Sequence, residues 1–120
     1  MANILAVDDS SSMRQMVTFT LKGAGHQVTE AADGQEALNK AKSQQFDLII
    51  TDVNMPVMDG ITFIKNLRTE VNYKFTPMLM LTTESAADKK SQGKAAGATG
   101  WIVKPFNPDQ LLNTVSKVLG

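Results

Sequence analysis

The sequence predicts an α/β fold with a doubly wound, five-stranded parallel sheet that carries helices on both faces. Short, mostly apolar segments alternate along the chain with stretches in which apolar residues recur at helical intervals. The apolar run at residues 48–51 is continuous rather than alternating, which is typical of a strand buried on both faces. Strands that alternate with helices through short loops form a parallel sheet with right-handed crossovers.

Five segments are expected to form the strands. They are residues 3–7, 27–31, 48–51, 78–81 and 101–103, each bounded by polar or turn residues. Asp52 follows the third segment, so it is expected at the carboxyl end of a central strand. In open α/β sheets this edge binds ligands. For Asp52 taken alone, capping of the next helix is the plainer interpretation.

Five helices are expected between and after these strands. Serines at positions 10–12 offer N-cap hydroxyls to the first helix, and glycines at 23 and 25 end it. The second helix runs to about residue 43, the third begins at Asp59-Gly60, the fourth spans residues 85–96, and the last begins at Asn107-Pro108. Residues 72–76 are expected to form a polar loop.

The fourth predicted helix has an unusual composition. It contains four alanines and no large aliphatic residue, and its interior Gly93 costs ~1 kcal/mol relative to Ala. Its exposed side is expected to carry Lys89, Lys90 and Lys94. So thinly anchored a helix lies at the low-stability end of a domain and suits a switch. An ordinary solvated helix is the alternative interpretation.

Composition excludes several classes of function. The 120 residues suit one domain, spanning 1–120, with one hydrophobic core. Twelve basic and twelve acidic residues cancel, so no bulk charge attracts nucleic acid or a membrane surface. The absence of cysteine excludes disulfides and thiolate chemistry. No signal peptide and no apolar run of ~18 residues are found, and we expect a cytoplasmic monomer.

Several chemically active side chains are expected to gather at one edge of the sheet. All the parallel strands end there, and the residues at their ends are Asp8, Asp9, Asp52, Thr82 and Lys104. Each has an ordinary explanation as a cap or a solvated group. Together, three carboxylates require a cation to neutralise them, and oxygen ligands without His or Cys indicate Mg²⁺. Adding a lysine and a hydroxyl makes a set suited to phosphoryl transfer, with an Asp carboxylate as nucleophile.

Four segments carry a resemblance to a known family. They read AVDDSSSMR, DLIITDVNMPVMDG, MLMLTTES and AGATGWIVKPF. In order and spacing they resemble the response-regulator receiver domain of two-component signalling, and among these the chain is similar to the single-domain, CheY-like chemotaxis regulators. The resemblance covers essentially the whole chain. It implies a flavodoxin-like (βα)5 fold with strand order 2-1-3-4-5.

The resemblance also implies roles for the residues at the edge. Asp52 accepts a phosphoryl group from a histidine kinase of the CheA type. Asp9, Asp52 and the backbone carbonyl of Asn54 hold Mg²⁺, while Asp8 acts through water. Lys104 pairs with the phosphoryl oxygens, and its bond to the following proline is typically cis in the family.

Other implied roles concern switching and output. Thr82 bonds a phosphoryl oxygen, and Trp101 occupies the aromatic switch position, where chemotaxis regulators commonly have Tyr. Simple packing of Trp101 is the alternative. Asn54 and Glu84 occupy the positions that tune the lifetime of the phosphoryl group. The expected partners are the kinase, a flagellar motor switch protein or a phosphatase, and a phosphate sink in a non-motor chemosensory pathway is the alternative output.

Three other functions are less consistent with the residues. A phosphatase with an Asp nucleophile typically has a second Asp two positions later as general acid, whereas this chain has Asn54. A nucleotide-binding domain needs a glycine-rich first turn, whereas this turn reads DDSSSM. For a DNA-binding transcription factor we expect an additional effector domain, which 120 residues do not accommodate.

Overall fold

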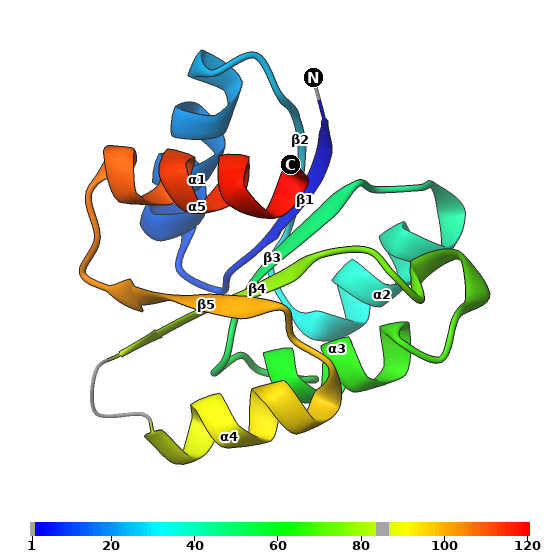
Figure 1. The fold of residues 1–120 in the computed structure, drawn as a ribbon. Helices are drawn as coiled ribbons and strands as arrows, with labels where there is room; N and C mark the ends of the chain where they lie inside the picture. The colour runs from blue at the N-terminus through cyan, green and yellow to red at the C-terminus, as the bar shows by residue number, and fades with distance from the viewer. Residues whose placement is uncertain (1, 84–86) are drawn as a thin grey trace.

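The computed structural model describes residues 2–83 and 87–120, and it has the predicted α/β architecture (Figure 1). The strands are β1 (Asn3–Val7), β2 (Gln27–Ala31), β3 (Leu48–Asp52), β4 (Met78–Thr83) and β5 (Gly100–Lys104). The helices are α1 (Ser11–Gly23), α2 (Gly34–Ser43), α3 (Gly60–Leu67), α4 (Ala87–Ala96) and α5 (Pro108–Leu119). A short 3₁₀ turn, η1 (Val71–Tyr73), follows α3.

The sheet is parallel throughout and has the strand order β2-β1-β3-β4-β5. The predicted order is therefore confirmed. Strand β3 lies at the centre, and all five of its residues are buried. This burial explains why the segment is apolar on both faces rather than alternating.

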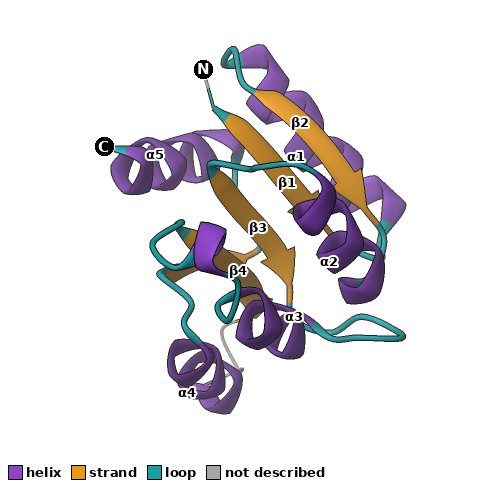
Figure 2. Cartoon of the chain, turned by 90° about the vertical axis from the view of Figure 1, so that its right-hand side faces the viewer, coloured by secondary structure: helices purple, strands orange, loops and turns teal. Residues whose placement is uncertain are grey.

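Helices cover both faces of the sheet, as predicted. Helices α1 and α5 lie on one face, and α2, α3 and α4 lie on the other (Figures 1 and 2). Each layer encloses its own apolar cluster, one around Val17, Leu21, Leu111 and Val115 and the other around Phe63, Ile64 and Leu67. The two clusters fix the sheet between two helical layers, so the strand ends that carry the polar residues are rigidly placed.

The prediction that residues 72–76 form a polar loop is wrong at its beginning. Turn η1 places Tyr73 in the core, only 2% exposed. The Tyr73 hydroxyl accepts a hydrogen bond from the Phe46 N–H at 3.2 Å and lies 2.8 Å and 2.7 Å from the carbonyl oxygens of Ala41 and Gln44, which share its one proton. These partners satisfy the hydroxyl inside the protein, which allows a tyrosine in a polar segment to be buried.

Helix α4 is the least anchored helix of the part of the chain that the structure describes. Its one buried residue is Gly93, where a Cβ atom would overlap the side chain of Met80. Its carboxyl end is held by Arg68, whose Nε donates to the Gly97 carbonyl oxygen at 2.9 Å. The predicted residues 85 and 86 of this helix, like Glu84, lie outside the described residues.

Candidate functional site

The five predicted site residues lie on four strand ends at the carboxyl edge of the sheet. Asp8 and Asp9 follow β1, Asp52 ends β3, Thr82 lies near the end of β4, and Lys104 ends β5. Strands β3, β4 and β5 are neighbours, and β1 pairs with β3 on its other side. The topology therefore brings together groups that are far apart in the sequence.

The backbone around Asp52 is tightly packed. Gly60, the first residue of α3, lies so close to the Asp52 carbonyl that a Cβ atom at this position would overlap the carbonyl oxygen. The Gly60 N–H donates to the Val53 carbonyl oxygen at 2.8 Å. Asp59 caps the helix by accepting the Thr62 N–H at 2.7 Å. Capping of α3 is thus the role of Asp59, which leaves the carboxylate of Asp52 free to face the site.

The Asp52 carboxylate is held in one orientation by two donors. Its Oδ1 accepts the Val53 N–H at 2.9 Å and the Lys104 ammonium at 3.0 Å. The side chain of Asp52 is nearly buried. Both donors bind the same oxygen. The second oxygen, Oδ2, accepts no hydrogen bond from residues 2–83 and 87–120. A carboxylate fixed by one oxygen and open at the other is suited to bind a cation or to attack an electrophile.

Asp8 carries a buried carboxylate with an unused oxygen. Its Oδ1 accepts the Ser10 N–H at 2.9 Å, but its Oδ2 has no hydrogen-bond partner. The Lys104 ammonium lies 3.8 Å from Oδ2, which is within ion-pair range but beyond a hydrogen bond. Burial raises the pKa of Asp8 above its ordinary value, and the Ser10 hydrogen bond opposes part of this shift.

The residues present fit a divalent cation. One ligand oxygen from each of Asp8, Asp9 and Asp52 lies within 4.8 Å of the others. Such a cluster of like charges is unfavourable without a counter-charge, and Lys104 supplies only one. The unsatisfied buried Oδ2 of Asp8 is the group that a bound cation, directly or through a water ligand, would satisfy.

A pocket with a cavity volume of about 140 Å³ opens beside Asp52. The predicted residues Thr82, Asn54 and Lys104 line it together with Thr83 and Lys89. Lys89, predicted on the exposed side of α4, is half-buried and is among the residues that line this pocket. Its position in the first turn after β4 was the available sequence signal, since that turn starts from the carboxyl edge.

Arg14 is a second residue that sequence reasoning missed. From α1 it donates through Nη1 to the backbone carbonyl of Asp8 at 2.7 Å and through Nε to Glu30 Oε1 at 2.8 Å. The guanidinium thus ties the end of β1 to β2. This bond holds the backbone from which Asp8 and Asp9 reach the site. No sequence pattern distinguished Arg14 from a solvated surface arginine.

Trp101 does not line the pocket beside Asp52. It is 39% exposed and lines a separate groove with Phe106 and Gln110 of the β5–α5 region. The Lys90 ammonium lies 5.6 Å from the centroid of its ring. Of the lysines predicted on the exposed side of α4, Lys90 is half-buried and Lys94 is exposed. The Lys104–Pro105 peptide bond is cis, as expected.

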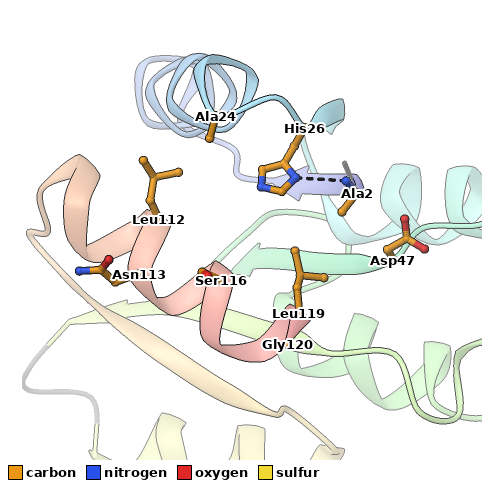
Figure 3. Close-up of a pocket in the computed structure, with 9 residues that line it drawn as sticks. All are labelled: Ala2, Ala24, His26, Asp47, Leu112, Asn113, Ser116, Leu119 and Gly120. Carbon is orange, nitrogen blue, oxygen red and sulfur yellow. Dashed lines mark hydrogen bonds between the residues drawn. The ribbon is translucent and has the colours of Figure 1, made fainter.

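A larger groove, of about 740 Å³, lies at the opposite edge of the sheet (Figure 3). It is lined by residues that precede strands, including Ala2, His26 and Asp47, and by residues of α5. The two ionisable side chains in this groove, His26 and Asp47, already have hydrogen-bond partners. His26 Nδ1 accepts the Ala2 N–H at 3.2 Å, and Asp47 accepts the Asn3 N–H at 2.8 Å. His26 therefore holds the start of β1.

The fold and the acidic pocket define the class of protein. The sequence profile of the response regulator receiver domain matches residues 4–116. The chain is 41% identical to the chemotaxis protein CheY-3 of Vibrio cholerae over 116 residues, which cover 96% of this chain and 89% of that protein. It is 40% identical to a CheY homolog of Campylobacter jejuni over 119 residues, or 98% of this chain and 92% of that protein.

Solved structures agree with this classification. The chemotaxis response regulator CheY4 of Vibrio cholerae matches with a TM-score of 0.94 and 62% identity over 98% of both chains. The receiver domain of a sensor histidine kinase from Pseudomonas aeruginosa, at 28% identity, matches with a TM-score of 0.92 over 99% of this chain and 98% of that one. That structure holds a magnesium ion in its active-site cleft. The chain belongs to the response-regulator receiver domain family, whose members are signalling proteins.

Proposed function

We propose that this chain is a phosphorylation-controlled switch whose phosphoacceptor is Asp52. One observation carries the proposal: a nearly buried carboxylate is held through Oδ1 by Lys104 at 3.0 Å and shares an acidic cluster with Asp8 and Asp9. A structural cap would need neither the ammonium nor the two further carboxylates. The phosphodonor is a histidine kinase of the CheA type, as is typical of the family.

Mg²⁺ is the cation proposed for the acidic cluster. Asp9 and Asp52 would bind it with the backbone carbonyl of Asn54, and Asp8 would act through a water ligand. When bound, Mg²⁺ neutralises charge on the transferring phosphoryl group. The oxygen-only donor set and the absence of cysteine in the chain favour this ion over zinc or copper.

The proposed reaction is transfer of one phosphoryl group to Asp52. A carboxylate oxygen attacks phosphorus and forms a P–O bond, while the bond from phosphorus to the donor breaks. The leaving group is the kinase imidazole, which takes up a proton from solvent, or acetate when acetyl phosphate is the donor. Lys104 stabilises the charge on the phosphoryl oxygens. Attack of water on phosphorus later returns the carboxylate and releases inorganic phosphate.

The output follows from groups that respond to the new charge. Thr82, 4% exposed and lining the pocket, donates its hydroxyl to a phosphoryl oxygen, and Trp101 then turns inward from its half-exposed position. The face formed by α4, β5 and α5 changes accordingly and binds its partner. Asn54 tunes how water reaches the phosphoryl group; Glu84, expected to do the same, lies outside the described residues.

A chemotaxis role is supported by the names of the relatives. We assign this chain to a chemotaxis pathway as a cytoplasmic monomer, with a flagellar motor switch protein or a phosphatase as partner. Among the described residues no helix has the length and apolar character needed to cross a membrane. Capture of a motor switch peptide by the phosphorylated protein, and not by Asp52→Asn, tests the motor assignment. Equal capture of both refutes it and favours the role of a phosphate sink.

Phosphorylation itself is tested by mass spectrometry of the intact protein. After incubation with acetyl phosphate and Mg²⁺, the mass of the wild type should increase by one phosphoryl group. Asp52→Asn should show no increase, because its amide is a poor nucleophile. Asp109→Asn, which changes an acid of the first turn of α5, is the matched control and should react like the wild type. An unchanged wild-type mass, or a phosphorylated Asp52→Asn, refutes the proposal.

A further inference from the structure

The pocket beside Asp52 contains a cation that the proposed reaction has not used. Lys89 is half-buried in α4 and lines this pocket with Asp52 and Lys104. Within residues 2–83 and 87–120 it makes no hydrogen bond and no ion pair. A half-buried lysine that lines an acidic pocket and has no ion-pair partner can bind an anion that forms there.

The charges of the site identify that anion. The carboxylates of Asp8, Asp9 and Asp52 would be balanced by Lys104 together with the proposed Mg²⁺. Converting Asp52 to its acyl phosphate adds one further negative charge at neutral pH. Lys89 is the one described lysine besides Lys104 that lines this pocket, so its ammonium restores the balance. The unphosphorylated site does not need this charge, whereas the phosphorylated site does.

The neighbouring residue connects the pocket to Trp101. Lys90 follows Lys89 in the first turns of α4, and its ammonium lies over the Trp101 ring at 5.6 Å from the centroid. Because both lysines extend from one rigid turn of helix, a displacement that brings Lys89 toward Asp52 also moves Lys90 relative to the ring. Trp101 itself lies outside the pocket, so this turn supplies a link between the two places.

The packing of α4 permits such a displacement. The carboxyl end of the helix is fixed, since Arg68 donates to the Gly97 carbonyl and the Ala98 N–H donates to the Gly93 carbonyl at 2.9 Å. Gly93 is the buried contact with the sheet, and no described residue before it in α4 is buried. A pivot of the helix about its Gly93–Gly97 end would bring its amino-terminal turn toward the site while these contacts are kept.

Taking these contacts together, and resting on the proposed phosphorylation of Asp52, we infer that Lys89 is a second phosphoryl-binding lysine. Its ion pair with the phosphoryl group draws the first turn of α4 toward the pocket and shifts Lys90 off the face of Trp101. Two adjacent lysines of α4 thus couple phosphorylation of Asp52 to a change around Trp101 at the exposed surface. This route is separate from the bond between Thr82 and the phosphoryl group.

The test uses beryllium fluoride, a stable mimic of the phosphoryl group, with Mg²⁺ and the full chain. Fluorine NMR measures its affinity, and fluorescence measures the change in Trp101 emission at saturation. Lys89→Gln should weaken the affinity about threefold, the size expected for one partly exposed ion pair, and should reduce the emission change, leaving the part that comes through Thr82. Lys89→Arg should restore both, because it keeps the charge. Lys94→Gln, an exposed lysine of the same helix, is the matched control and should behave like the wild type.

The outcomes separate the two levels of the hypothesis. If the wild type binds the mimic and Lys89→Gln equals Lys94→Gln in affinity and emission, the role of Lys89 is refuted while the proposed function stands. If Lys89→Gln loses affinity but keeps the full emission change, the link through Lys90 is refuted. A wild type that neither binds the mimic nor accepts a phosphoryl group refutes the proposed function and this inference with it.

Discussion

Replacing Asp9 with Asn should make the metal-free protein more stable. Its carboxylate is exposed, and its ligand oxygen lies within 4.8 Å of those of Asp8 and Asp52. At this separation one pair of like charges costs roughly 0.9 kcal/mol in water and about 3.5 kcal/mol at an effective dielectric constant of 20. Lys104, whose ion pairs are with Asp52 and Asp8, offsets part of this repulsion. Because Asp9 is exposed, we expect a gain of about 1–2 kcal/mol in the free energy of unfolding at low ionic strength.

Mg²⁺ should reverse the order of stability. A ligand that binds only the folded state at 100 times its dissociation constant adds about 2.7 kcal/mol. The wild type should gain this amount, whereas Asp9→Asn, having lost a ligand, should gain little. Urea unfolding followed by circular dichroism measures both proteins in EDTA and in Mg²⁺. With a slope of about 2 kcal/mol per molar urea, the midpoints should differ by roughly 0.5–1 M in EDTA.

Asp109→Asn is the control for simple removal of a negative charge. Asp109 lies in the first turn of α5, where a negative charge is favourable, so its loss should lower stability by about 0.3–1 kcal/mol. Added salt should shrink the gain of Asp9→Asn, because the repulsion is screened. If Asp9→Asn is no more stable than the wild type in EDTA, repulsion between the carboxylates does not destabilise the folded protein. If Mg²⁺ stabilises both proteins equally, Asp9 is not a ligand.

Three further predictions follow from individual residues. Val57 is exposed and has a φ of +68°, which disfavours a β-branched side chain, so Val57→Asn should raise the free energy of unfolding by about 0.5–1 kcal/mol in urea melts; a loss would show that the side chain is needed. Gly60→Ala should lower it by about 1–3 kcal/mol and slow phosphorylation, because the new methyl group displaces the Asp52 carbonyl; wild-type stability and rate would contradict this. Burial raises the pKa of Tyr73, the one tyrosine of the chain, above 10.0, so phenolate absorbance should appear at higher pH in the folded than in the urea-unfolded protein. Stability should therefore be lost as the pH rises above about 10, and Tyr73→Phe should reduce that loss; coincident titrations would refute the assignment.

The fold could be predicted because its signals are local. Strand β3 is buried on both faces, so a continuous apolar run identified it, and caps such as Asp59 and Asn107 marked the helix starts. Once the strands are parallel, their carboxyl ends share an edge whatever the details of packing. The convergence of Asp8, Asp52 and Lys104 followed from this rule alone. Tyr73 was missed because its burial depends on carbonyl groups that only the folded chain brings to it.

The orientation of side chains on α4 could not be predicted. The helix has a single buried residue, Gly93, and no apolar stripe, so its sequence does not reveal which side faces the sheet. Lys89, Lys90 and Lys94 are chemically identical in the sequence. The structure separates them: one lines the pocket, one lies over Trp101, and one is exposed. Their different roles arise from their angle around a helix whose placement is set by contacts at its far end.

Strand β3 and helix α4 differ in the free-energy cost of displacing them. This difference decides which of the two would move if Asp52 is phosphorylated. Charge-assisted hydrogen bonds to a phosphoryl group contribute about 1.5–3 kcal/mol each. Displacing β3 would expose buried residues such as Ile49 and Ile50, at about 1.5–3 kcal/mol for each large side chain, so the acceptor strand does not move. Shifting the amino-terminal turn of α4 would break the cation–π pair of Lys90 and Trp101, worth about 0.5–1 kcal/mol, and none of residues 87–92 is buried. If Asp52 is phosphorylated as proposed, the new bonds would reposition α4 before they disturb the sheet, and Trp101, whose ring centroid lies 5.6 Å from the Lys90 ammonium, would change its surroundings while the acceptor strand stays in place.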